Sequence, residues 1–175
     1  MRRDPGMEPV EEVRLLVLAA QREGNRALAS ELRPLGLTPS QGEVLRLLAG
    51  RQPLSLSGLG ALLVCESGSN PSRLVDRLVA AGFVHREVDG HDRRHVALTL
   101  TDAGRRAAEG VAVVEGRLHA RIAEAATGHD LEQVRGFLRA LVAGSGAGDA
   151  VALRASAPAA ADPVEDPEPA HGPCR

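Results

Sequence analysis

The side chains best suited to chemistry gather in two polar stretches, and the first spans residues 67–77. Hydroxyl and amide groups stand there ahead of two arginines that are one helical turn apart. Hydroxyl and amide groups can bind phosphates or base edges, and a guanidinium can bind a guanine edge with two parallel N–H groups. The first stretch therefore predicts a DNA-binding surface. Its candidate residues are Ser69, Asn70, Ser72, Arg73 and Arg77.

The second polar stretch, residues 91–95, has the sequence His-Asp-Arg-Arg-His. An arginine at the tip of a hairpin can enter a minor groove or lie along phosphates. We expect Arg93 and Arg94 to make such contacts. The carboxylate of Asp92 repels DNA, so its expected role is to hold an arginine in position by a bidentate pair.

Three helices are predicted ahead of these stretches. Apolar residues recur at three- and four-residue steps over about Pro9–Arg33, which indicates one helix face. Thr38 as N-cap and Pro39 at the first helical position begin a second helix, which Gly50 ends. A short third helix fits about Leu56–Cys65.

The first polar stretch lies on a fourth predicted helix, about Asn70–Ala81, followed by Gly82 as a C-terminal stop. Alternating apolar residues then predict two strands, joined by the loop that carries the second polar stretch. Two more helices follow. The expected strands are Phe83–Val88 and Val96–Leu100, and the expected helices are Asp102–Ala126 and Asp130–Ala143. The predicted fold is mainly α with a small antiparallel β-hairpin, which is a winged helix-turn-helix with added helices.

Composition and charge indicate one folded unit with a polar tail. Apolar residues make up 43% of the 175 residues, enough for a core, whereas residues 146–175 are rich in Ala, Pro and acid. We predict that this tail is disordered. No apolar run reaches the length of a membrane span, and the first residues lack the apolar stretch of a secretory signal. We therefore expect a cytoplasmic, nucleoid-associated protein without membrane contact.

Enzyme and metal functions are poorly supported by the sequence. No Gly-x-Ser-x-Gly elbow, His-Glu-x-x-His motif or phosphate loop occurs, so we expect neither catalysis nor a cofactor. Loop histidines such as His91 and His95 lack cysteine partners, and no metal site is predicted. A redox role for Cys65, which precedes a predicted helix start, stays open as an alternative. A helical protein-interaction module without DNA contact is a second alternative.

Several motifs together resemble the MarR family of bacterial transcriptional regulators. The resemblance covers about residues 10–143. Its motifs are Leu-Thr-Pro-Ser-Gln at 37–41, Arg-Leu-Val-Asp-Arg-Leu at 73–78, Ala-Gly-Phe-Val at 81–84, Asp-Arg-Arg at 92–94 and Leu-Thr-Leu-Thr-Asp-Ala-Gly-Arg at 98–105. The resemblance implies a homodimeric winged-helix protein that binds double-stranded DNA, usually a repressor released by a small molecule or an oxidant.

Domain boundaries and partners follow from this resemblance. Residues 37–101 would form the DNA-binding domain, with the helix 70–81 in the major groove, and residues 8–36 and 102–143 the dimerisation region. Two recognition helices related by a twofold axis imply a pseudo-palindromic operator. The effector we expect is a small anionic or lipophilic acid, with Arg14, Arg22 and Arg26 as candidate ligand-binding residues. Many relatives carry a bulky residue where Gly42 stands, so a ligand pocket lined from that helix would differ here.

Overall fold

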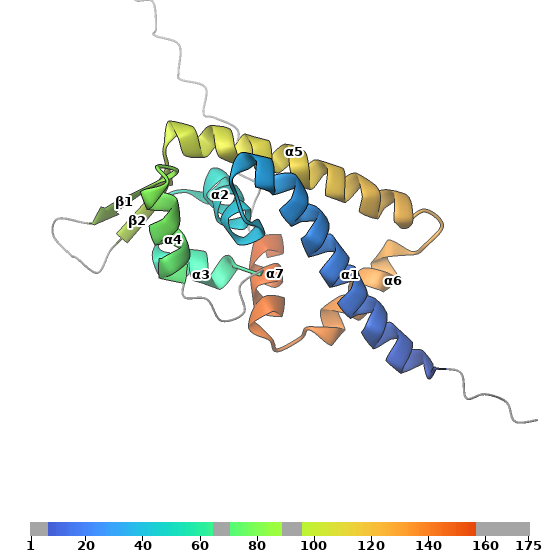
Figure 1. Ribbon diagram of the computed structural model, residues 1–175. Helices are drawn as coiled ribbons and strands as arrows, with labels where there is room; N and C mark the ends of the chain where they lie inside the picture. Colours follow the sequence, from blue (N-terminus) through green and yellow to red (C-terminus); the bar gives the residue numbers. More distant parts are fainter. Residues whose placement is uncertain (1–6, 65–70, 89–95, 157–175) are drawn as a thin grey trace, which may run out of the picture.

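The computed structural model describes residues 7–64, 71–88 and 96–156, and within these ranges the chain is helical apart from one hairpin (Figure 1). The predicted fold class is confirmed. The order of elements is three helices, a fourth helix, two strands and then helices again. The bounds are α1 Pro9–Leu32, η1 Arg33–Leu35, α2 Pro39–Arg51, α3 Leu56–Leu62, α4 Pro71–Ala80, β1 Val84–Val88, β2 Val96–Leu100, α5 Asp102–Ala125, α6 Leu131–Leu141 and α7 Gly146–Ser156.

Local capping explains where the helices of the winged domain begin. At α2, the Thr38 hydroxyl accepts from the Gln41 N–H, while the Gln41 side chain accepts from the Thr38 N–H at 2.9 Å. This reciprocal pair is a capping box. Ser55 caps α3 in a similar way, its hydroxyl accepting from the Gly58 N–H at 3.0 Å. The helix α3 ends at Leu62, three residues earlier than predicted.

The hairpin pairs β1 with β2 in antiparallel register, from Val84 opposite Leu100 to Val88 opposite Val96. Leu54 adds a one-residue bridge to Leu98, with N–H to O distances between the two backbones of 3.2 and 2.8 Å. The hairpin is thereby attached to the chain between α2 and α3, which fixes its direction relative to the helices.

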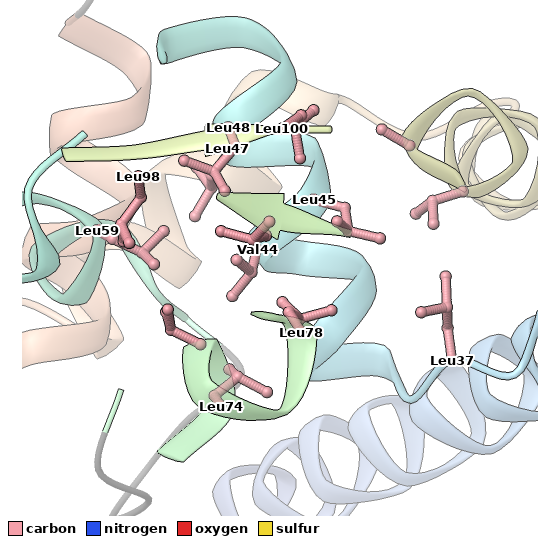
Figure 2. Packing of buried hydrophobic residues seen from close by; sticks show 14 of the residues in the cluster. Leu37, Val44, Leu45, Leu47, Leu48, Leu59, Leu74, Leu78, Leu98 and Leu100 are labelled. Atoms are coloured by element: carbon pink, nitrogen blue, oxygen red, sulfur yellow. The ribbon is translucent and has the colours of Figure 1, made fainter. Parts of the chain in front are cut away.

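The apolar core lies within the winged domain and against the first half of α5. Figure 2 shows leucine and valine side chains from α2, α3, α4 and the hairpin converging there. Gly42 of α2 faces this junction. A Cβ at that position would lie 3.2 Å from both Leu32 and Val111 side-chain carbons, so glycine permits close packing of α2 against α1 and α5.

The helices outside the winged domain leave much apolar surface uncovered. The long helices α1 and α5 pack on each other, and no residue of α6 is buried. Exposed large apolar side chains on these three helices include Val10, Leu16, Leu18, Val113, Ile122, Leu131, Val134, Phe137, Leu138 and Leu141. So many exposed large apolar side chains on three neighbouring helices are typical of an interface.

The prediction of disorder from residue 146 is wrong for residues 146–156, which form α7 and pack against α3. Ala150 is buried, and Arg154 reaches the backbone of α3 at Leu62. The prediction rested on the small number of large apolar residues in this segment. Much of the contact between α7 and the rest of the chain is instead polar. Residues 157–175 lie outside the described ranges. Among the helices that the structure describes, none is long and apolar enough to cross a bilayer.

Candidate nucleic-acid interface

Helix α4 is divided into an inner and an outer face. Leu74, Val75 and Leu78 are buried in the core, while Arg73 and Arg77 are exposed on the outer face. The apolar spacing of the sequence predicts this inner face, although it also places Val79 there and that side chain is 37% exposed. A helix anchored by one face and basic on the other can enter a major groove without disturbing the core.

An ion pair connects the outer face of α4 to the hairpin. Arg86 of β1 donates from Nη1 to Oδ1 of Asp76 at 2.9 Å. Asp76 lies three residues from Arg73 on the same helix, but it pairs with Arg86 of β1. Arg73 and Arg77 form no ion pair with any residue of the described ranges, so their guanidinium groups are available to an anionic partner.

The C-terminal end of α4 is held by a tight turn. Gly82 has a φ of +76°, and the Phe83 N–H donates to the Leu78 carbonyl at 2.9 Å. The Thr101 hydroxyl, which also caps α5, donates to the Gly82 carbonyl at 2.7 Å. The end of α4 is therefore fixed to the start of α5.

The same junction explains a glycine in α5. A Cβ at Gly104 would lie only 1.9 Å from the Phe83 carbonyl oxygen, so no larger residue fits without backbone movement. Nearby, the pKa of the Asp102 carboxyl is lowered, first by its hydrogen bond from Arg105 and then by the charge of that guanidinium.

Only part of the predicted site falls within the described residues. Ser72 lies in the first turn of α4 and is half-buried. Ser69 and Asn70 lie outside the described ranges, as do Cys65 and the whole Asp92-Arg93-Arg94 run. The DNA-contacting roles of all these residues stay predictions. The residues that the structure describes contain no group of three or more His, Cys, Asp or Glu placed to hold a metal ion.

The three arginines predicted to bind an effector lie apart on α1. Arg14 borders an apolar groove of about 730 Å³ between α1 and α6, together with Val13, Phe137 and Leu141. Arg22 and Arg26 are exposed farther along the helix and do not line this groove. Of the three, Arg14 alone borders this groove.

Two charged residues with structural roles were missed by the sequence analysis. Arg86 appeared only as a strand residue, and Glu43 only as part of the second helix. Their partners are far away along the chain or on another element: Asp76 for Arg86, and Arg154 for Glu43. Helical or strand periodicity indicates which residues share a face of one element, so it does not predict ion pairs between different elements.

A sequence model of the MarR family matches residues 35–95, which span α2, α3, α4 and the hairpin. The uncharacterized HTH-type transcriptional regulator YkoM of Bacillus subtilis is 41% identical over 69 residues, 39% of this chain and 44% of that protein. The HTH-type transcriptional regulator TtmR of Methylorubrum extorquens is 39% identical over 89 residues, 51% of this chain and 45% of that protein. The matches thus span less than half of each relative's length.

The fold also occurs in solved structures. A crystal structure of a mutant MarR from E. coli in complex with operator DNA aligns with a TM-score of 0.65 at 23% identity, covering 78% of this chain and 99% of that one. At this identity the likeness concerns the fold, and it extends beyond the winged domain to the flanking helices.

Proposed function

We propose that this chain, which belongs to the MarR family through residues 35–95, binds a specific site in double-stranded DNA and regulates transcription there. The observation that carries the proposal is the outer face of α4. Two exposed arginines one turn apart, without carboxylate partners in the described ranges, lie on a helix whose other face is fixed in the core. The winged-helix structure of E. coli MarR bound to operator DNA supports this reading of the fold.

In this proposal α4 is the recognition helix. Arg73 and Arg77 bind guanine edges or phosphates in the major groove, and Ser69, Asn70 and Ser72 add hydrogen bonds at the helix start. The hairpin between β1 and β2 is the wing. Its loop carries Arg93 and Arg94 toward the minor groove or the flanking phosphates, with Asp92 orienting an arginine.

The functional unit we propose is a homodimer. Burial of the exposed apolar side chains of α1, α5 and α6 against a second copy would remove them from water. A twofold axis through this face presents two α4 helices to successive major grooves, about 10 base pairs apart. The DNA site is then a pseudo-palindrome.

Repression with release by an effector completes the proposal. An effector that binds in the α1–α6 groove of the dimerisation region can change how the two copies pack, and with it the distance between the two α4 helices. Arg14 provides a cation beside apolar side chains, a combination that suits an aromatic or lipophilic acid. Benzoate and decanoate are suitable probes, and loss of DNA binding in their presence is the expected result.

Selection from a pool of random duplexes tests the proposal. The full chain is incubated with the pool, and the bound duplexes are recovered over several rounds. The recovered duplexes are then sequenced. We expect enrichment of one motif with two inverted half-sites. Recovery of unrelated sequences, or of no DNA above the background of a protein-free control, would contradict the proposal and favour a helical interaction module.

A further inference from the structure

The carboxylate of Glu43 is the one buried charged group of the described chain, with 8% of its surface exposed. It lies on α2, and its partner comes from α7. Arg154 donates from Nη2 to Oε1 of Glu43, and from Nε to the Leu62 carbonyl at 2.8 Å. Arg51 donates to the Arg154 carbonyl at 2.9 Å. The last turns of α7 are thereby attached to both α2 and α3.

The same carboxylate oxygen holds the end of α3. Oε1 of Glu43 accepts from the backbone N–H of Val64 at 2.8 Å. Val64 is the last described residue before residues 65–70, which lead directly into α4. A buried carboxylate needs a cation beside it, and Arg154 supplies one. Arg154 therefore stabilises the acceptor that holds the backbone just after α3.

The other end of α7 is joined closely to α6. Gly144 turns the chain with a φ of +75°, and the Ser145 hydroxyl donates to the Val142 carbonyl at 2.7 Å. The same hydroxyl accepts from the Gly148 N–H at 3.1 Å. In Figure 1, α7 follows α6 and turns back toward α3. The helix α7 is thus hydrogen-bonded to the end of α6 at its start and to α2 and α3 at its end.

We propose that Arg154 is a positioning residue for DNA binding, because it fixes α2 through Glu43 and the end of α3 through the Leu62 carbonyl, and α4 packs against both helices. This inference rests on the proposed function. Specific contacts to base edges require a helix held to within about 0.5 Å of its productive position. Non-specific binding depends on charge near phosphates and tolerates a looser helix. The loss of Arg154 should therefore weaken specific binding far more than non-specific binding.

The test compares two duplexes: one selected by the wild-type chain from a random pool, and a scrambled duplex of the same composition. For Arg154→Met we expect about a tenfold loss of affinity for the selected duplex, within the range of energetic coupling between distant sites. Affinity for the scrambled duplex should stay within a factor of about two, since the charge near phosphates is unchanged. Arg154→Lys keeps a cation beside Glu43 and should recover most of the loss.

Arg135→Met is the matched control, because Arg135 also pairs with a glutamate, Glu132, but on the exposed surface of α6. It should bind both duplexes like the wild type. Hydrogen exchange without DNA provides a second readout. The Val64 amide should exchange faster in Arg154→Met than in the wild type or the control, because its acceptor is no longer held.

Two results would overturn the inference: unchanged affinity for the selected duplex in folded Arg154→Met, or equal losses on both duplexes. If Arg154→Met does not fold, the double variant Glu43→Gln with Arg154→Met leaves no unpaired buried charge and should show the same selective loss. If the wild-type chain selects no sequence, the proposed function fails first. If, in addition, the Val64 amide of Arg154→Met exchanges as slowly as that of the wild type, Arg154 does not hold this part of the backbone.

Discussion

Asp76 of α4 and Arg86 of β1 form an ion pair with an N–O distance of 2.9 Å. The pair joins α4 to the hairpin on the surface that faces DNA in our proposal. Because the Asp76 carboxylate is paired with Arg86, Arg73 and Arg77 have no carboxylate partner within the described ranges. The helix α4 and the hairpin are thus connected by this ion pair as well as by the backbone turn at Gly82.

A double-mutant cycle measures the coupling free energy between Asp76 and Arg86. Asp76→Ala, Arg86→Ala and the double variant should give a coupling free energy of about 0.2–1 kcal/mol in urea unfolding, since both side chains are partly exposed. Arg46→Ala with Glu115→Ala, another exposed pair at 3.0 Å, serves as a reference of similar geometry. A coupling of zero would mean that the Asp76–Arg86 pair does not form in solution.

The wing prediction concerns Arg94 and Asp92. Arg94→Ala should lower affinity for the selected duplex strongly, while melting temperature and oligomeric state stay nearly unchanged, because a loop residue contributes little to the core. The salt dependence of binding should become less steep by about one counterion. Asp92→Ala should produce a milder loss, because the arginine keeps its charge and loses its orientation. Normal binding by both variants at physiological salt would refute the wing.

The dimer is tested at Phe137, which is half-exposed beside the α1–α6 groove. Phe137→Asp places a carboxylate in the apolar face, so light scattering at micromolar concentration should show monomers where the wild type shows dimers. Affinity for the two-half-site duplex should fall with it, because a monomer binds only one half-site. Arg135→Asp, on the same helix, is the control and should stay dimeric. A monomeric wild type, or a dimeric Phe137→Asp, would contradict the assigned interface.

Acid sensitivity is predicted at the start of α5. The pKa of Asp102 is held below its usual value of 3.8, chiefly by the hydrogen bond from Arg105. A group with a lowered pKa stabilises the fold above its unfolded-state pKa, and this contribution is lost as pH falls through the folded-state pKa. The melting temperature of Asp102→Asn should therefore lie slightly below that of the wild type at pH 7, and the difference should vanish in acid. A difference that persists or grows in acid would refute this prediction.

The order of elements could be predicted because its signals are local. Thr38 with Pro39 marks the start of α2, and Gly82 marks the end of α4, within a residue or two of the predicted positions. The amphipathic pattern of α4 likewise predicted its inner face, because apolar residues at helical spacing turn together toward a core. Val79, at the edge of that face, is nevertheless 37% exposed.

Contacts between distant parts of the chain were not predictable. The helix α7 has few large apolar residues, and its attachment depends on Arg154 meeting Glu43 across 111 residues. Gly104 looks like any helical glycine in the sequence, although the carbonyl of Phe83 occupies the space of its Cβ. Both features arise only when separate elements are packed together, so no local spacing rule could have identified them.

The most direct test of DNA reading by α4 is the base preference of Arg73→Ala and Arg77→Ala, measured on the selected duplex and on its single base-pair variants. We predict that each base-contacting arginine, once removed, abolishes the preference at one position of each half-site and costs about 1–3 kcal/mol there. An arginine that binds phosphate should instead weaken binding to all duplexes alike and reduce the salt slope by about one. If both variants keep the affinity and base preferences of the wild type, α4 is not the helix that reads DNA.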